Sequence, residues 1–135
     1  MKFKVSKKDK SVTQKIKVPA RDEKNKKVTY LIDVTYRVLK NSEFQEFRES
    51  IKPEFDDEGN LIKDPIKDVD HLFGLMGDKI LNISGLVGDD NEDLEFNQDL
   101  LYSLFEDKDA VLPIYRGFMV ANSPEEIEEA RIKNS

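Results

Sequence analysis

The chain has 135 residues, of which 38% are hydrophobic and 37% charged, and its formal net charge at pH 7 is −6. This length fits one domain, and eight Phe with four Tyr can fill a core. The lack of cysteine excludes disulfides, thiolate nucleophiles and cysteine-ligated zinc, and no run approaches the roughly 20 apolar residues that span a bilayer. We therefore expect a single cytoplasmic domain over residues 1–135, without a signal peptide or membrane segment.

Charge divides the chain into two unequal parts. Residues 1–30 hold eleven Lys or Arg and three acidic residues, which gives a net charge of +8. Residues 31–135 hold eleven Lys or Arg and twenty-five acidic residues, which gives a net charge of −14. A basic arm can bind nucleic acid through phosphates, but these lysines lie among strand-like residues with only Phe3 as an early aromatic neighbour. We expect no nucleic-acid binding. We expect instead that these lysines lie on a solvated strand face, or that they contact the acidic remainder of the chain or an acidic partner.

The first 39 residues predict a β-hairpin. Residues 12–18 alternate apolar and polar side chains until Pro19, which we expect to close the strand, and residues 28–38 alternate again. The polar segment 21–27 between them is typical of a turn. Because an isolated hairpin is marginal in water, its apolar face must pack against later elements.

Residues 40–122 predict helices. A first short helix begins at Ser42 with a capping-box pattern and ends at Pro53, and residues 53–63 have the composition of an exposed loop or hairpin. Asp64 and Pro65 start a second helix. Its apolar residues recur every three or four positions and predict one continuous helix to about Ser84, with this stripe: Ile66, Val69, Phe73, Met76, Ile80 and Ile83.

The remaining elements are also helical. Asn97 caps a third helix, Asp109 starts a fourth that tolerates Pro113 in its first turn, and Ser123 begins a charged tail helix over residues 123–135. The expected fold class is therefore α+β, with a small N-terminal antiparallel hairpin or sheet followed by a bundle of four to five helices.

The residue types of catalytic and metal sites do not form a recognisable pattern. His71 is the only histidine and lies off the main helical stripe, and no serine stands in a nucleophile-elbow motif. Asp89, Asn91 and Asp93 match the opening of a calcium-binding EF-hand loop, but Leu94 and Leu100 occupy its required Gly and Glu positions. Phosphate-binding glycine motifs are absent from the sequence. We expect no enzyme activity, no catalytic residue, no cofactor and no metal.

The fourth helix carries more apolar residues than one buried stripe needs. We predict a partner-binding surface there, formed by Leu112, Tyr115, Phe118 and Met119. The alternative is that a small domain buries this helix on two sides.

Several short motifs recur in the order of a known family. The lysine-rich residues 15–19 precede residues 34–39, Val-Thr-Tyr-Arg-Val-Leu, which look like an aromatic-Arg-x-Leu lead into a first helix. Residues 80–86 resemble an aliphatic-x-x-Trp-x-Gly-Val helix ending, with Ile83 in place of Trp. An acidic loop, a cap at residues 94–97, a Leu-Leu helix and a final helix with Phe118 follow.

On these motifs, residues 12–122 resemble the tail assembly chaperones of long-tailed, siphovirus-type bacteriophages. The resemblance implies a protein that binds the tape measure protein, with tail tube subunits and further copies of itself as additional partners. Such a chaperone keeps its client soluble in the host cytoplasm and is absent from the mature virion. A rival hypothesis is a structural tail-completion or head-tail connector protein, which stays in the particle.

Overall fold

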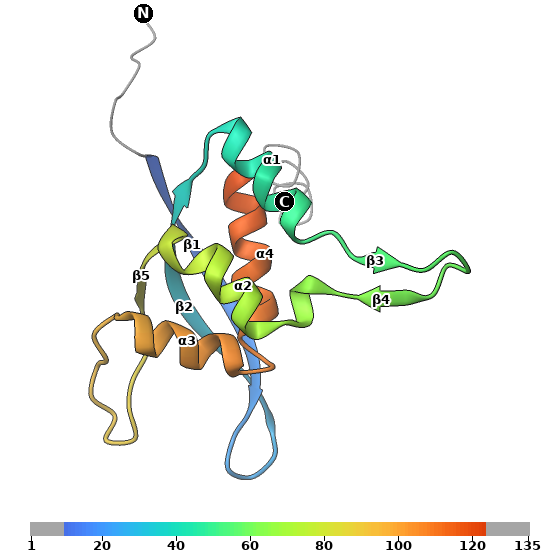
Figure 1. The fold of residues 1–135 in the computed structure, drawn as a ribbon. Helices are drawn as coiled ribbons and strands as arrows, with labels where there is room; N and C mark the ends of the chain where they lie inside the picture. The colour runs from blue at the N-terminus through green and yellow to red at the C-terminus, as the bar shows by residue number, and fades with distance from the viewer. Residues whose placement is uncertain (1–9, 124–135) are drawn as a thin grey trace, which may run out of the picture.

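The chain folds as a three-stranded antiparallel sheet with four α-helices in residues 10–123, the part that the computed structural model describes (Figure 1). The strand order is β1-β2-β5, and a separate two-stranded ribbon is formed by β3 and β4. The expected mixture of an N-terminal antiparallel sheet and later helices is confirmed. The predicted tail helix at 123–135 lies outside the described residues, apart from Ser123.

The predicted hairpin is present as β1 (Lys10–Arg21) and β2 (Lys27–Val38). Ile16 pairs with Ile32 across the two strands, so their side chains share the face that becomes the core. Pro19 does not close β1 as we expected, because β1 is an edge strand, where a residue without an N–H is tolerated.

The second helix was predicted too long. Asp64 caps a 3-10 helix (Pro65–Lys67), and Asp68 then caps α2, which spans only Val69–Met76. A second 3-10 helix (Gly77–Lys79) leads into β5 (Ile80–Ser84), which pairs with β2.

A β-bulge explains why β5 looked helical in the sequence. Val34 pairs with Ile83 and Tyr36 pairs with Ile80. The five residues of β5 therefore lie opposite only four residues of β2, and Leu81 is the extra residue. The bulge turns Ile80 and Ile83 to the same buried face, although they are three positions apart. A spacing of three on one face is the signature that we had assigned to a helix.

The other helices begin close to their predicted positions. They are α1 (Asn41–Ser50), α3 (Gln98–Glu106) and α4 (Val111–Asn122), and Asn97 caps α3 as predicted. The amide of Lys40 donates to Glu43 at the start of α1, so Ser42 is not the cap. Asp107, not Asp109, accepts the amide hydrogen bonds in the turn before α4.

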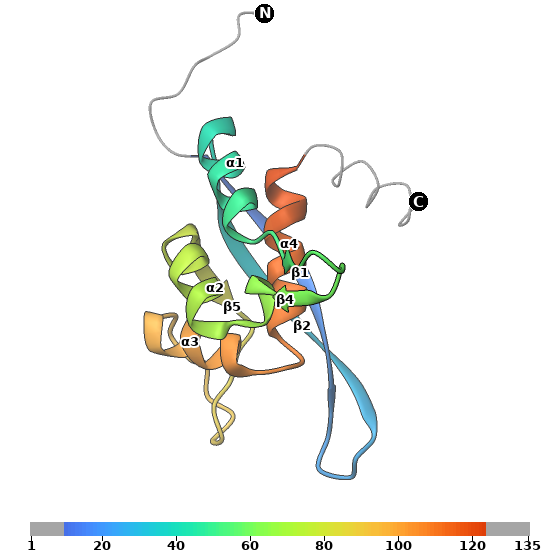
Figure 2. The ribbon, with the colours of Figure 1, turned by 45° about the vertical axis from the view of Figure 1, so that its right-hand side comes forward.

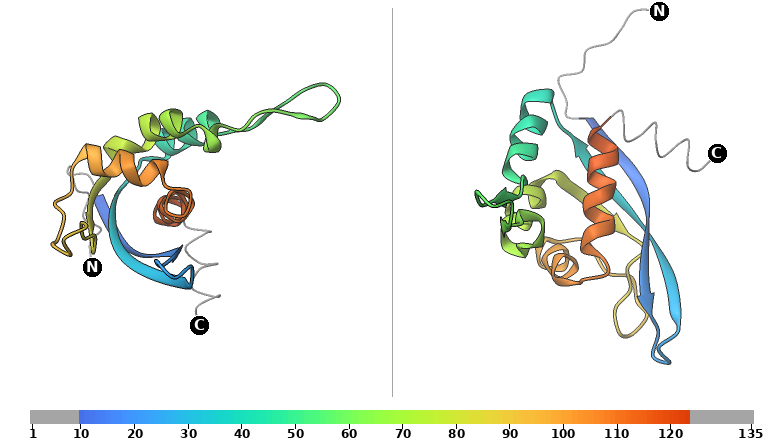
Figure 3. Two further views of the ribbon diagram at one scale, coloured as in Figure 1. Left: turned by 90° about the horizontal axis from the view of Figure 1, so that it is seen from below. Right: turned by 90° about the vertical axis from the view of Figure 1, so that its right-hand side faces the viewer.

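Helix α4 lies in the concave side of the curved β1–β2 hairpin, while α1, α2 and α3 cover the rest of the same side (Figure 3). The core is continuous and includes residues from the sheet and all four helices; its most buried large side chains are Val34, Tyr36, Leu72, Met76, Leu101, Phe105, Ile114 and Phe118. In the described residues, no helix is long and apolar enough to cross a membrane.

Two hairpins extend beyond this core. The turn end of β1–β2 projects past the helices, and the ribbon of β3 (Glu54–Phe55) and β4 (Leu61–Lys63) projects in another direction (Figures 1 and 2). We had expected residues 53–63 to be an exposed loop or hairpin, and the hairpin is confirmed.

Candidate partner-binding surface

An open apolar groove lies between the start of α2 and the junction of α3 with α4. Its volume is about 440 Å³. Charged side chains rim it, two acidic and two basic: Asp64, Lys67, Glu106 and Lys108. The apolar residues that line it are Ile66, Val69, Phe105, Val111 and Leu112, and we call this site the apolar groove.

Helix α4 exposes Leu112 in this groove because the helix has two apolar stripes. One stripe is buried against the sheet and α1 and consists of Ala110, Ile114, Gly117, Phe118 and Ala121. Leu112, Tyr115 and Met119 lie three and four residues apart on the other side of the helix. Leu112 is 41% exposed, whereas Tyr115 and Met119 are half-buried and pack against the core.

Phe118 does not belong to an accessible surface. Its side chain is fully buried, and its ring centroid lies 4.8 Å from that of Phe47 and 6.0 Å from that of Tyr36. Our prediction that Phe118 contacts a partner is therefore wrong. The prediction that α4 is apolar on more than one side is correct, because Phe118 fills the core while Leu112 remains open to solvent.

A buried contact fixes α4 against the sheet. The Tyr36 hydroxyl donates to the backbone carbonyl of Ile114, with an oxygen–oxygen distance of 2.8 Å. Burial raises the pKa of this hydroxyl, so it stays protonated and able to donate. Gly117 lets the strand side chains approach: a Cβ there would lie 2.5 Å from the Tyr36 hydroxyl and 2.5 Å from Cδ1 of Ile16. This contact therefore holds α4 against β2 at close range.

A polar pair that sequence patterns do not reveal joins α2 to α3. The Tyr102 hydroxyl donates to Asp70 at 2.6 Å, and this hydrogen bond, with smaller effects of desolvation and nearby charge, raises the pKa of Tyr102 to about 12. The Tyr102 ring also meets Phe73 edge to face, with centroids 5.2 Å apart.

We predict that Asp70→Asn lowers the pKa of Tyr102 from about 12 towards the ordinary value near 10. The carboxylate favours the protonated phenol, so the folded pKa lies above the unfolded one. This interaction therefore stabilises the fold fully below about pH 10, and the stabilisation is lost as pH rises towards 12. Tyrosine Cζ chemical shifts followed by NMR between pH 8 and 13 measure the shift. An unchanged Tyr102 titration would contradict the contact.

His71 has a structural environment. Its Nε2 lies 2.9 Å from the backbone carbonyl oxygen of Ser50, so the imidazole connects α2 to the end of α1. His71 is half-buried.

The two acidic loops use their polar groups to form turns. The amides of Glu58 and Asn60 donate to Asp56, and the Asn60 amide is the main reason that the pKa of Asp56 lies below its usual value. In the second loop, the amide of Glu92 donates to Asp90. Within residues 10–123, no three His, Cys, Asp or Glu side chains gather as a metal site would require.

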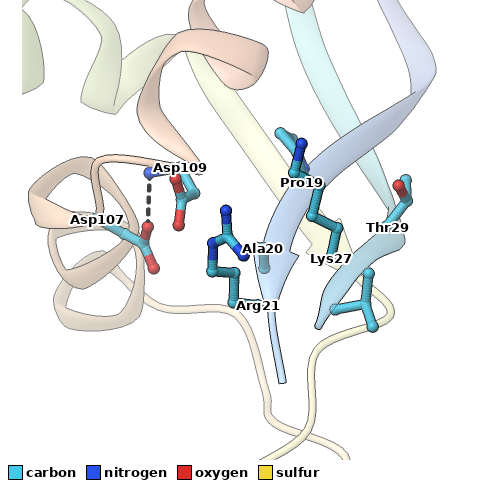
Figure 4. Close-up of a pocket in the computed structure, with 8 residues that line it drawn as sticks. Pro19, Ala20, Arg21, Lys27, Thr29, Asp107 and Asp109 are labelled. Atoms are coloured by element: carbon cyan, nitrogen blue, oxygen red, sulfur yellow. Dashed lines mark hydrogen bonds between the residues drawn. The ribbon is translucent and has the colours of Figure 1, made fainter. Parts of the chain in front are cut away.

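A second pocket opens between β1–β2 and the α3–α4 turn (Figure 4). Arg21 lies on the strand side, and Asp107 and Asp109 lie on the turn opposite to it, where the amide of Asp109 donates to Asp107. Its two basic and two acidic side chains, Arg21, Lys27, Asp107 and Asp109, make its charge mixed. A pocket with both charges does not favour a ligand of one charge, whereas the apolar groove favours an apolar ligand.

Comparison with known proteins found no similar family, curated protein or solved structure.

Proposed function

We propose that this protein is a phage tail assembly chaperone that binds the tape measure protein and keeps it soluble during tail assembly. The observation that carries the proposal is the apolar groove, in which Leu112 is 41% exposed beside Ile66, Val69 and Val111. An extended helical client with an exposed apolar face would pack such residues into a groove of this kind. The motif at residues 34–39 that leads into α1 and the cap at residues 94–97 before α3 support the same assignment, whereas residues 80–84 form strand β5 and not the helix ending that the resemblance implied.

The acidic character of the chain supports a chaperone role. A net charge of −6 resists co-aggregation with an apolar client, and charges of both signs on the rim can pair with polar residues that flank the client's apolar stripe. Binding of this kind uses no cofactor and no catalytic residue. We infer action in the host cytoplasm, with tail tube subunits as a further class of client.

The groove is tested by Leu112→Asp, which places a charge in the apolar lining. Asp is favourable in the first turn of α4, so the fold should stay intact. We expect binding of the tape measure protein to weaken roughly 30-fold or more, as loss of an interface residue worth about 2 kcal/mol implies. The measurement is co-expression with the tape measure protein, followed by pull-down and a solubility assay.

Leu81→Asp is the matched control. Leu81 is 46% exposed in β5 and does not line the groove. We expect this variant to keep the client soluble. Equal loss of binding in both variants, or no loss in Leu112→Asp, would contradict the groove assignment.

A connector or tail-completion protein is the second candidate. The two projecting hairpins favour it, because a heterologous contact through them would join subunits into a ring if the rotation closes. Purified particles separate the two functions. A chaperone is absent from them, whereas a connector is present in fixed copy number.

A further inference from the structure

The β3–β4 ribbon has the features of a docking arm. Every residue from 52 to 63 is exposed, and the arm keeps its shape through the Asp56 turn. Three large apolar side chains on it face solvent: Phe55 at 58%, Leu61 at 51% and Ile62 at 65% exposure. A two-stranded ribbon is marginal on its own. Exposed apolar residues on such a ribbon indicate that it is completed by another surface.

The charge of the arm restricts what that surface is. Residues 54–63 contain four acidic residues and one lysine, a net charge of −3. Its acidic residues are Glu54, Asp56, Asp57 and Glu58, and the first two flank Phe55 in the sequence. The complementary surface is therefore both apolar and basic.

The turn end of the β1–β2 hairpin has this composition. Residues 15–31, which we call the basic end, contain six Lys or Arg and two acidic residues, a net charge of +4. One of the acidic residues, Asp22, is occupied by the amides of Lys24 and Lys26. Tyr30 and Leu31 add apolar side chains that are 53% and 51% exposed.

The arm and the basic end of one molecule point away from its body in different directions (Figures 1 and 2). The arm therefore does not lie on its own basic end. A second copy of this chain offers the same basic end without this geometric restriction.

We propose that copies of this protein associate head to tail, with the acidic arm of one copy docked on the basic end of the next. Each copy has one arm and one basic end, so the contact is heterologous and repeats until a ring closes or a chain grows. The apolar groove takes no part in this contact, so self-association and client binding are separate properties. Because the contact pairs opposite charges at the surface, it weakens as ionic strength rises.

Two charge-reversal variants test the contact. Asp57→Lys with Glu58→Lys changes the net charge of the arm from −3 to +1 and leaves the Asp56 turn intact. Lys24→Glu, Lys26→Glu and Lys27→Glu together change the net charge of the basic end from +4 to −2, and the backbone amides that donate to Asp22 are kept. Sedimentation equilibrium over a range of concentrations at low salt gives the average mass. We expect the wild-type mass to exceed the monomer mass of 15.6 kDa and each variant to sediment as a monomer.

Mixing the two variants distinguishes this contact from a general effect of charge. In an equimolar mixture, the basic arm of one variant faces the acidic end of the other, and the remaining acidic arm faces the remaining basic end. We therefore expect mixing to restore the higher mass. Asp89→Lys with Glu92→Lys makes the same change of charge in the exposed second acidic loop, and we expect it to leave self-association unchanged.

The apolar part of the contact has its own variant. Phe55→Ser with Ile62→Ser keeps the charge of the arm, and we expect it to reduce the average mass towards that of the monomer. A monomeric wild-type protein, or two variants that remain monomeric on mixing, would overturn the proposal. Loss of client binding by the arm variants with no change in mass would also overturn it, by assigning the arm to the client.

Discussion

Phe118→Ala is expected to destabilise the fold by about 3 to 5 kcal/mol, as truncation of a large buried aromatic side chain does. Phe118 has no exposed surface, and its ring packs between Phe47 of α1 and Tyr36 of β2. Removing this ring leaves a cavity where α4, α1 and the sheet meet. Urea unfolding followed by circular dichroism measures the loss.

Two comparisons make this result specific. Met119→Ala, at the half-buried neighbouring position, is expected to cost less than Phe118→Ala. Phe73→Ala, at a position of the apolar stripe that the sequence predicted for the second helix, is expected to cost less too. Phe73 is half-buried and meets Phe105 and Tyr102 through edge-to-face contacts. A change below about 1 kcal/mol in Phe118→Ala would contradict this core.

Gly117→Ala is the second large expected effect. Ala gains up to about 1 kcal/mol over Gly in a helix, but overpacking a filled core typically costs 1 to 3 kcal/mol. The new Cβ would lie 2.5 Å from Cδ1 of Ile16, which can rotate, and 2.5 Å from the Tyr36 hydroxyl. That hydroxyl is held by its hydrogen bond to Ile114 and by complete burial of its ring. We therefore expect a net loss of about 2 kcal/mol, read from the urea midpoint.

Gly74→Ala is the matched control, because Gly74 lies in α2 with nothing within 4 Å of the added Cβ. Without a steric cost, helix propensity should stabilise this variant by up to about 1 kcal/mol. Opposite signs for the two substitutions are the expected result. A gain in stability at both positions would show that the sheet can move away from α4.

The elements defined by local pattern were predictable from the sequence. Period-two alternation correctly indicated β1 and β2, and Asn97 correctly marked the start of α3. The sequence failed at β5, because the bulge at Leu81 gives a strand the apolar spacing of a helix. Only pairing with β2, a contact distant in sequence, decides between these conformations.

The candidate site was predictable in part. The apolar excess on α4 correctly indicated that Leu112 is surplus to the core, but periodicity did not show which of Leu112 and Phe118 faces the sheet. The apolar groove required tertiary structure, since its lining comes from separate elements at residues 66–69, 105 and 111–112. The arm could be predicted as a loop or hairpin, but its function as a docking surface depends on its projection from the body.

The packing of α4 in the concave face of β1–β2 has a consequence for synthesis. The ribosome delivers the first strand about a hundred residues before the helix that covers it, and at 5 to 20 residues per second this interval lasts several seconds or more. During that time the apolar face of the hairpin, including Ile16 and Ile32, lacks its final cover. A nascent chain stalled before residue 111 should therefore be recognised by ribosome-associated chaperones and by proteases, whereas a chain synthesised past residue 123 should fold rapidly and escape both.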